Sequence, residues 1–87
     1  MTTIPDPRAP LPALEEVWSQ NFELVNRFQL KYRADLMNVI GRSWYVPLTV
    51  GIAQPDAYEL GRAIDALQEQ VERRFGMDVA LVLDLAA

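Results

Sequence analysis

The first part of the chain carries a broad apolar stripe at helical spacing. Between residues 13 and 40, apolar side chains recur at intervals of three and four, and polar side chains occupy the opposite side. Neither proline nor glycine interrupts the segment, and Gly41 follows it as a typical helix stop. The pattern predicts one helix over residues 13–40, about 40 Å long at 1.5 Å per residue. The stripe consists of Leu14, Val17, Trp18, Phe22, Val25, Phe28, Tyr32, Leu36, Val39 and Ile40.

Two later segments have a different period. Large apolar side chains alternate with small or polar ones over residues 44–53 and again over residues 78–85, which predicts two strands. Pro47 lies within the first of them. Because proline has no amide hydrogen to donate, at least one side of this strand near Pro47 is expected to be a sheet edge.

A second helix is predicted between these strands, over residues 55–75. Its apolar side chains again recur at intervals of three and four, and Gly76 ends it. Pro55 suits the first helical position. The sequence leaves open whether Gln54 or Asp56 is the N-cap of this helix.

The order helix, strand, helix, strand predicts an α+β fold, or a small α/β fold, in two layers. A long N-terminal helix precedes a strand–helix–strand unit, which favours parallel strands and a right-handed crossover. An antiparallel pairing of the two strands across a dimer fits the sequence equally well. One face of so small a sheet is left without a helix, so we expect a second subunit to complete or cover the sheet. That face carries Tyr45, Thr49, Gly51, Ala80 and Val82.

The N-terminal segment differs from the rest in its proline content. Residues 1–12 contain four of the six prolines. Since proline lacks an amide donor and restricts the residue before it, this segment is predicted to be an extended or disordered arm, with a docking strap as the alternative. Residues 13–87 are then a single domain.

The composition excludes several classes of function. The 87 residues include neither cysteine nor histidine, which excludes serine–histidine and cysteine–histidine catalysis and zinc sites with nitrogen or sulfur ligands. We therefore expect no enzyme activity and no cofactor. The net charge of −4 lacks the positive field of a general nucleic-acid binder. No apolar run approaches the roughly 20 residues of a membrane span, no secretory signal is visible, and the absence of cysteine fits a cytoplasmic location.

Two groups of charged residues are candidate functional sites. Asp78 and Asp84 bracket the last predicted strand, but no glycine-rich phosphate loop accompanies them. A carboxylate-dependent enzyme at a dimer interface is therefore an alternative, and an acidic residue that ends a strand is the favoured interpretation. Arg27, Lys31 and Arg42 lie along one side of the first predicted helix and suggest a nucleic-acid-linked regulator that acts across a dimer. Acidic residues four positions away favour salt bridges on a solvated face instead.

A second apolar strip carries the leading hypothesis. Leu30, Ala34 and Met37 lie opposite the main stripe of the first predicted helix, Tyr58 is similarly displaced on the second, and Trp18 lies near the end that overhangs the domain. Three apolar residues in register on a polar face suggest a contact surface, so these five are the predicted interaction residues. The alternatives are that the first helix is sandwiched, with both of its faces in the core, and that Trp18 is a core anchor.

The sequence therefore favours a small non-catalytic protein–protein interaction module. It would act as a dimeric adaptor, an accessory subunit or an inhibitor of a larger complex, and the inhibitor alternative includes proteins of phage or mobile-element origin. The expected partner is another protein or a second copy of the chain, with nucleic acid not favoured and no membrane involved.

Overall fold

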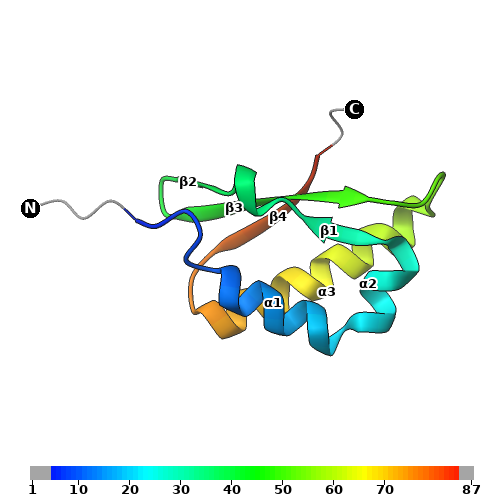
Figure 1. Ribbon diagram of the computed structural model, residues 1–87, viewed down its shortest axis with the longest axis horizontal. Coiled ribbons are helices and arrows are strands. Elements are labelled where there is room, and N and C mark those ends of the chain that lie inside the picture. The colour runs from blue at the N-terminus through cyan, green and yellow to red at the C-terminus, as the bar shows by residue number, and fades with distance from the viewer. Residues whose placement is uncertain (1–4, 85–87) are drawn as a thin grey trace, which may run out of the picture.

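The computed structural model describes residues 5–84, which form a two-layer fold of helices and sheet. Figure 1 shows α1, α2 and α3 on one side of the sheet. The predicted mixture of helix and sheet is thus confirmed. Along the chain, the elements are α1 (Leu11–Gln20), α2 (Phe22–Phe28), β1 (Leu30–Tyr32), the single-turn 3-10 helix η1 (Ala34–Leu36), β2 (Asn38–Ile40), β3 (Ser43–Val50), α3 (Ala57–Phe75) and β4 (Val79–Leu83).

The sheet is built around β3. On one edge, β1 and β2 pair antiparallel with the two halves of β3, so that Leu30 lies opposite Val50 and Ile40 opposite Ser43. On the other edge, β4 pairs with β3 in parallel. The predicted parallel strand–helix–strand unit is therefore confirmed as β3–α3–β4. Asp56 is the N-cap of α3, because its side chain accepts a hydrogen bond of 2.9 Å from the Glu59 amide.

Pro47 explains why β1 and β2 are two short strands. The Pro47 carbonyl accepts a hydrogen bond of 2.8 Å from the Arg33 amide, so the polar groups of this residue face the edge that carries β1 and β2. On that edge Pro47 has no N–H to offer, and the neighbouring chain leaves the sheet there as η1. The sequence predicted a sheet edge near Pro47, whereas β3 is the central strand and only the pairing along one of its sides is interrupted at Pro47.

The predicted helix over residues 13–40 is wrong. The first helix ends at Asn21, whose side-chain amide nitrogen donates to the Val17 carbonyl at 2.8 Å and to the Gln70 side chain at 2.9 Å. The second helix ends at Gln29, which adopts a left-handed conformation with φ 49° and ψ 51°. The chain beyond it pairs with β3, which lies far along the sequence, and such long-range pairing is invisible to a local periodicity.

Part of the predicted N-terminal arm packs on the domain. Residues 1–4 lie outside the described residues. Pro10 is buried, the Asp6 carbonyl accepts a hydrogen bond of 2.9 Å from the Trp44 indole, and α1 already begins at Leu11. Pro12 lies in the first turn of α1, where a missing N–H costs no helical hydrogen bond. Residues 6–10 therefore lie against the domain, as in the alternative prediction of a docking strap.

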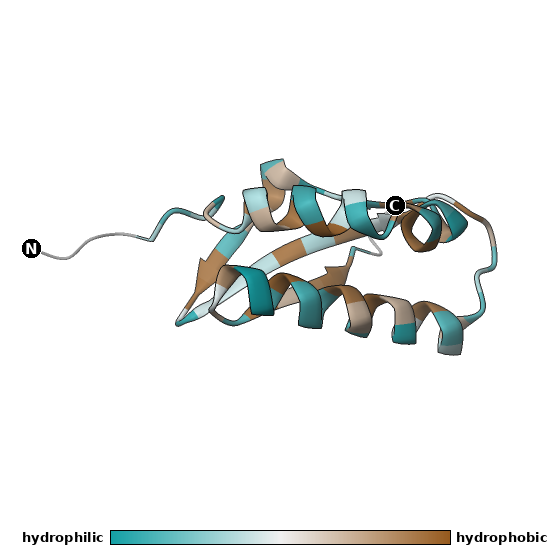
Figure 2. Ribbon diagram, turned by 90° about the horizontal axis from the view of Figure 1, so that it is seen from below, coloured by the Kyte–Doolittle hydropathy of each residue, from teal (hydrophilic) through white to brown (hydrophobic). Residues whose placement is uncertain are grey.

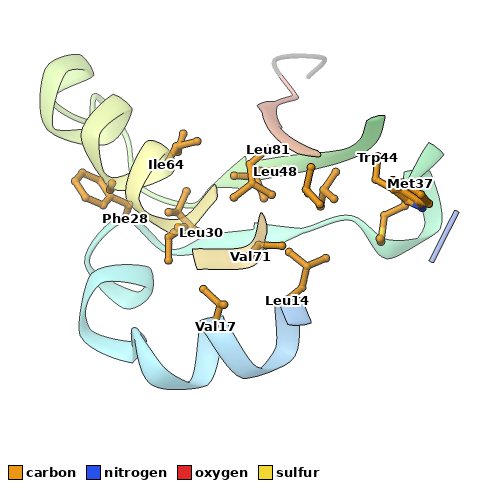
Figure 3. Packing of buried hydrophobic residues seen from close by; sticks show 14 of the residues in the cluster. Leu14, Val17, Phe28, Leu30, Met37, Trp44, Leu48, Ile64, Val71 and Leu81 are labelled. Carbon is orange, nitrogen blue, oxygen red and sulfur yellow. The ribbon is translucent and has the colours of Figure 1, made fainter. Parts of the chain in front are cut away.

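The hydrophobic core lies between the sheet and the helices. Figure 3 shows buried side chains from α1, α3 and the strands meeting there, among them Leu14, Val71 and Leu48. Two tryptophans frame this core. The ring of Trp44 meets that of Phe75 edge-on with centroids 5.0 Å apart, and Trp18 meets Tyr32 in the same way at 5.2 Å.

Gly51 is needed where β3 leaves the sheet. Its amide donates to the carbonyls of Phe28 and Gln29, and a Cβ built at residue 51 would lie 2.7 Å from the Gln29 Cβ. Backbone hydrogen bonding thus holds the end of β3 against the end of α2 at a distance that only glycine fits.

We expect Gly51→Ala to lower the free energy of unfolding by about 1–3 kcal/mol, because the new methyl group displaces Gln29. Urea denaturation would measure this loss. Gln29→Gly removes the clashing side chain, so Gly51→Ala should cost much less in that background. An equal cost in both backgrounds would contradict the close approach as the cause.

Candidate protein-interaction face

Side chains alternate along the strands, so the sheet has two faces, and α1, α2 and α3 all lie against one of them. Figure 2, which views the molecule of Figure 1 from below, shows α1 and α3 running side by side across this covered face. In Figure 1 only η1, among the described elements, rises on the other side. We call this side the open sheet face. It carries Lys31, Asn38, Ile40, Tyr45, Pro47, Thr49, Ala80, Val82 and Asp84.

The centre of the open sheet face is apolar. Ile40, Tyr45 and Val82 keep 59%, 36% and 47% of their surface exposed. Together with Pro47 they form what we call the apolar patch, and they line a shallow hollow whose rim includes Asp84. Scattered single apolar residues are common on protein surfaces, but adjacent ones on three strands form a contact surface.

Charged side chains lie toward one end of the open sheet face. Lys31 lies opposite Thr49, and Asp84 follows directly after β4 on the other side of β3. Nearby, the Arg33 guanidinium donates to the Asp35 carboxylate at 2.9 and 3.1 Å. This hydrogen bonding lowers the pKa of Asp35 and raises that of Arg33, with a smaller contribution to Arg33 from the charge of Asp84. Positive and negative groups are thus interleaved at this end.

The outer edge of β4 is occupied by a side chain of α3. The Asp84 amide donates to Leu48 in β3, so alternate amides of β4 face β3 and that of Leu81 faces outward. The Leu81 amide donates to Oε1 of Gln68 at 3.0 Å. An unpaired edge invites another strand, and Gln68 fills the central donor position of this edge.

The sequence assigned Leu30, Ala34 and Met37 to one exposed helical strip, and this strip does not exist. Leu30 and Met37 are only 2% and 7% exposed, and half-buried Ala34 packs against the core. The cause is the strand structure after residue 29. In β1 the alternation of side chains turns Leu30 inward. Met37 comes directly after η1, and its side chain is buried in the core.

The other two predicted interaction residues lie apart from the open sheet face. Trp18 is half-buried, and its indole donates to the Leu30 carbonyl at 3.1 Å, so it acts in the packing of α1 on β1. Tyr58 is 73% exposed at the start of α3, with the Arg62 guanidinium 5.8 Å from its ring centroid. A contact role for either residue stays a prediction.

Sequence reasoning did identify part of the open sheet face. Tyr45, Thr49, Ala80 and Val82 were expected on an uncovered side, and the register places them there. It missed Ile40, which was counted in the buried stripe of the long helix. The run Asn38–Ile40 has only three residues, too few to show the alternation that would have revealed a strand.

The charged candidates from the sequence do not form a shared site. Arg27 in α2 is paired with Glu59 in α3, Lys31 lies on the open sheet face, and Arg42 lies in the turn after β2. Asp78 and Asp84 stand at opposite ends of β4, about 20 Å apart at the rise of a strand. Within residues 5–84, no cluster of three or more acidic side chains could hold a metal ion.

Comparison of the chain with protein-family models, with curated proteins and with solved structures found no match. Among the described residues, no helix is both long and apolar enough to cross a membrane.

We expect Gln68→Ala to open the edge of β4. The outward Leu81 amide loses its acceptor, so its hydrogen exchange should accelerate, and light scattering should show more association with rising concentration. Asp65→Ala, on the solvent side of the same helix, is the matched control. Unchanged exchange at Leu81 would show that Gln68 does not protect this edge.

Proposed function

We propose that this chain is a small non-catalytic protein–protein interaction module whose contact surface is the open sheet face. The observation that carries the proposal is the apolar patch of Ile40, Tyr45, Pro47 and Val82. In the part of the chain that the structure describes, no second layer covers this patch. An apolar centre with a polar and charged rim is the usual anatomy of a protein interface.

The energetics support contact through this face. Burial of a large apolar side chain contributes about 1.5–3 kcal/mol when it is fully exposed beforehand. Since between a third and three fifths of the surface of Ile40, Tyr45 and Val82 is exposed, a partner that covered them would gain about 1 kcal/mol from each. Since association costs about 4–15 kcal/mol, hydrogen bonds and ion pairs at the rim must add to this gain before a specific contact forms.

The module would serve as a dimeric adaptor, as an accessory subunit or as an inhibitor of a larger complex. We keep the cytoplasm as the proposed location on the composition alone. A nucleic-acid-linked role receives less support, because Arg27 is neutralised by Glu59 and the three basic candidates lie on separate elements.

Site-specific photo-crosslinking tests the proposal. A benzophenone side chain in place of Tyr45 should form covalent adducts with a defined protein in the producing cell, identified by mass spectrometry. The same group in place of Asp65, on the outer surface of α3, should give far fewer adducts. Equal yields at the two positions, or none at position 45, would count against the open sheet face as the contact surface.

A further inference from the structure

We propose that the occupant of the open sheet face is an amphipathic helix of a partner protein, which lies along β3 and β4 beside η1 and pairs an acidic residue with Lys31. The inference rests on the proposed function and names the chemistry of the partner at the same surface. It follows from the composition of β4, the position of η1, the occupied edges of the sheet and the charge of Lys31.

The composition of β4 is typical of a strand that is covered on both faces. All residues of Val79–Leu83 are apolar, and β4 pairs with β3 in parallel. Parallel strands normally have helices on both faces, and such strands read as continuous apolar runs. Val79 and Leu81 are buried on the covered face, whereas Ala80 and Val82 continue the run on the open sheet face, where residues 5–84 supply no α-helix. A helix of a partner would supply this second layer.

The shape of the open sheet face fits a helix better than a second sheet. η1 rises on this side, so the face is a trough with η1 along one flank, and Leu36 of η1 is 47% exposed there. The apolar patch is its floor and lines a hollow of about 380 Å³. An α-helix with its side chains is about 10–12 Å wide, close to the roughly 10 Å that three strands span. A second sheet would have to lie flat about 10 Å above the whole face, and η1 stands in that space.

Addition of a partner strand at an edge is disfavoured, because side chains already bond backbone groups of the outer strands. Gln68 occupies the edge of β4. The Val39 amide of β2 donates to Oδ1 of its neighbour Asn38 at 2.9 Å. The Leu30 carbonyl of β1 accepts a hydrogen bond of 3.1 Å from the Trp18 indole. An added strand would have to displace these bonds, whereas a helix on the face needs no backbone group of the sheet.

Lys31 indicates the charge of the partner. It is exposed on the open sheet face opposite Thr49, and among residues 5–84 it forms no ion pair. The nearby Arg33 is already paired with Asp35 at 2.9 Å. Asp84 takes part in an interaction within its own chain, so no contact with the partner is assigned to it. An acidic residue on the flank of the helix that faces β1 would therefore meet a cation without a carboxylate partner.

The length of the trough determines the length of the helix. From Ser43 to Thr49, β3 rises about 20 Å, which corresponds to about 13 residues of α-helix. Such a segment presents three or four large apolar side chains to the sheet, at intervals of three and four. Contact through so few side chains gives a dissociation constant of roughly 10 μM to 1 mM.

Crosslinks from three strands test the shape of the occupant. Benzophenone side chains in place of Ile40, Tyr45 and Val82 should each join the same protein in the producing cell. Mass spectrometry should place the joined residues at intervals of three and four within one segment, because residues of one helix face recur at that spacing. Joined residues at intervals of two, or spread over separate segments, overturn the helix and leave the proposed function in place. The absence of any adduct at position 45 counts against both.

The joined segment, synthesised as a peptide of about 18 residues, tests the charge. Mixed with the purified chain, the peptide should gain helical circular dichroism, since so short a helix is marginal in water on its own. Lys31→Glu should weaken binding about 3–10-fold, and a peptide with lysine at its acidic position should bind this variant better than the original peptide does. Arg73→Glu, a charge reversal on the outer surface of α3, is the matched control and should leave the affinity unchanged.

The outcomes for the peptide separate the helix from its ion pair. If Lys31→Glu does not fold, Lys31→Gln takes its place and should weaken binding about 2–5-fold. Equal affinity of the original chain and the folded Lys31 variant overturns the pairing with an acidic residue. A peptide that gains no helix with the chain at about 1 mM overturns the helix as the occupant.

Discussion

The missing amide hydrogen of Pro47 is the constraint on which the sheet depends. Pro47 lies in the middle of the central strand and faces the edge that carries β1 and β2, where it can accept a hydrogen bond from Arg33 but cannot donate one. A continuous neighbouring strand would meet an empty donor position there. The chain instead leaves the sheet as η1 and returns as β2, which brings Asp35 and Leu36 to the rim of the open sheet face. One residue type thus shapes both the sheet and its surface.

The elements that the sequence predicted correctly are those whose signals are local. Asp56, the apolar stripe of α3 and Gly76 lie on one continuous helix, so the helix needs no distant partner to be recognised. The segment after α2 differs. Its strands have three residues each, too few to show a period of two. β1 forms because β3 offers it hydrogen bonds from 16–20 residues further along the chain, whereas β2 pairs with β3 across the short turn at Gly41 and Arg42. Intervals of three and four also occur by chance across Asn21 and Gln29, where the helices actually end.

The errors and successes at the candidate site have the same origin. Tyr45 and Val82 belong to strands that the sequence identified, and strand alternation then sufficed to place them opposite the buried Trp44 and Leu81. Leu30 and Met37 were assigned to an exposed helical surface, and their burial was only the alternative interpretation. Whether a side chain faces the core or solvent depends on the type of secondary structure. When a strand is predicted as a helix, side chains that face the core are therefore predicted to face solvent.

Under the proposed function, two features of the sheet favour contact through its face over contact through its edges. Trp44, Val46 and Leu48 are buried under the helices, and the strict alternation that buries them exposes Tyr45 and Pro47 on the other side. At the same time, Gln68 occupies the outward edge of β4, and η1 interrupts the opposite edge. A partner that approaches an edge meets satisfied or displaced backbone groups, whereas one that approaches the face meets apolar side chains that gain from burial. Within residues 5–84 the three helices lie on the same face, so burial of that face stabilises the fold, and the apolar patch on the other face supports the proposed contact.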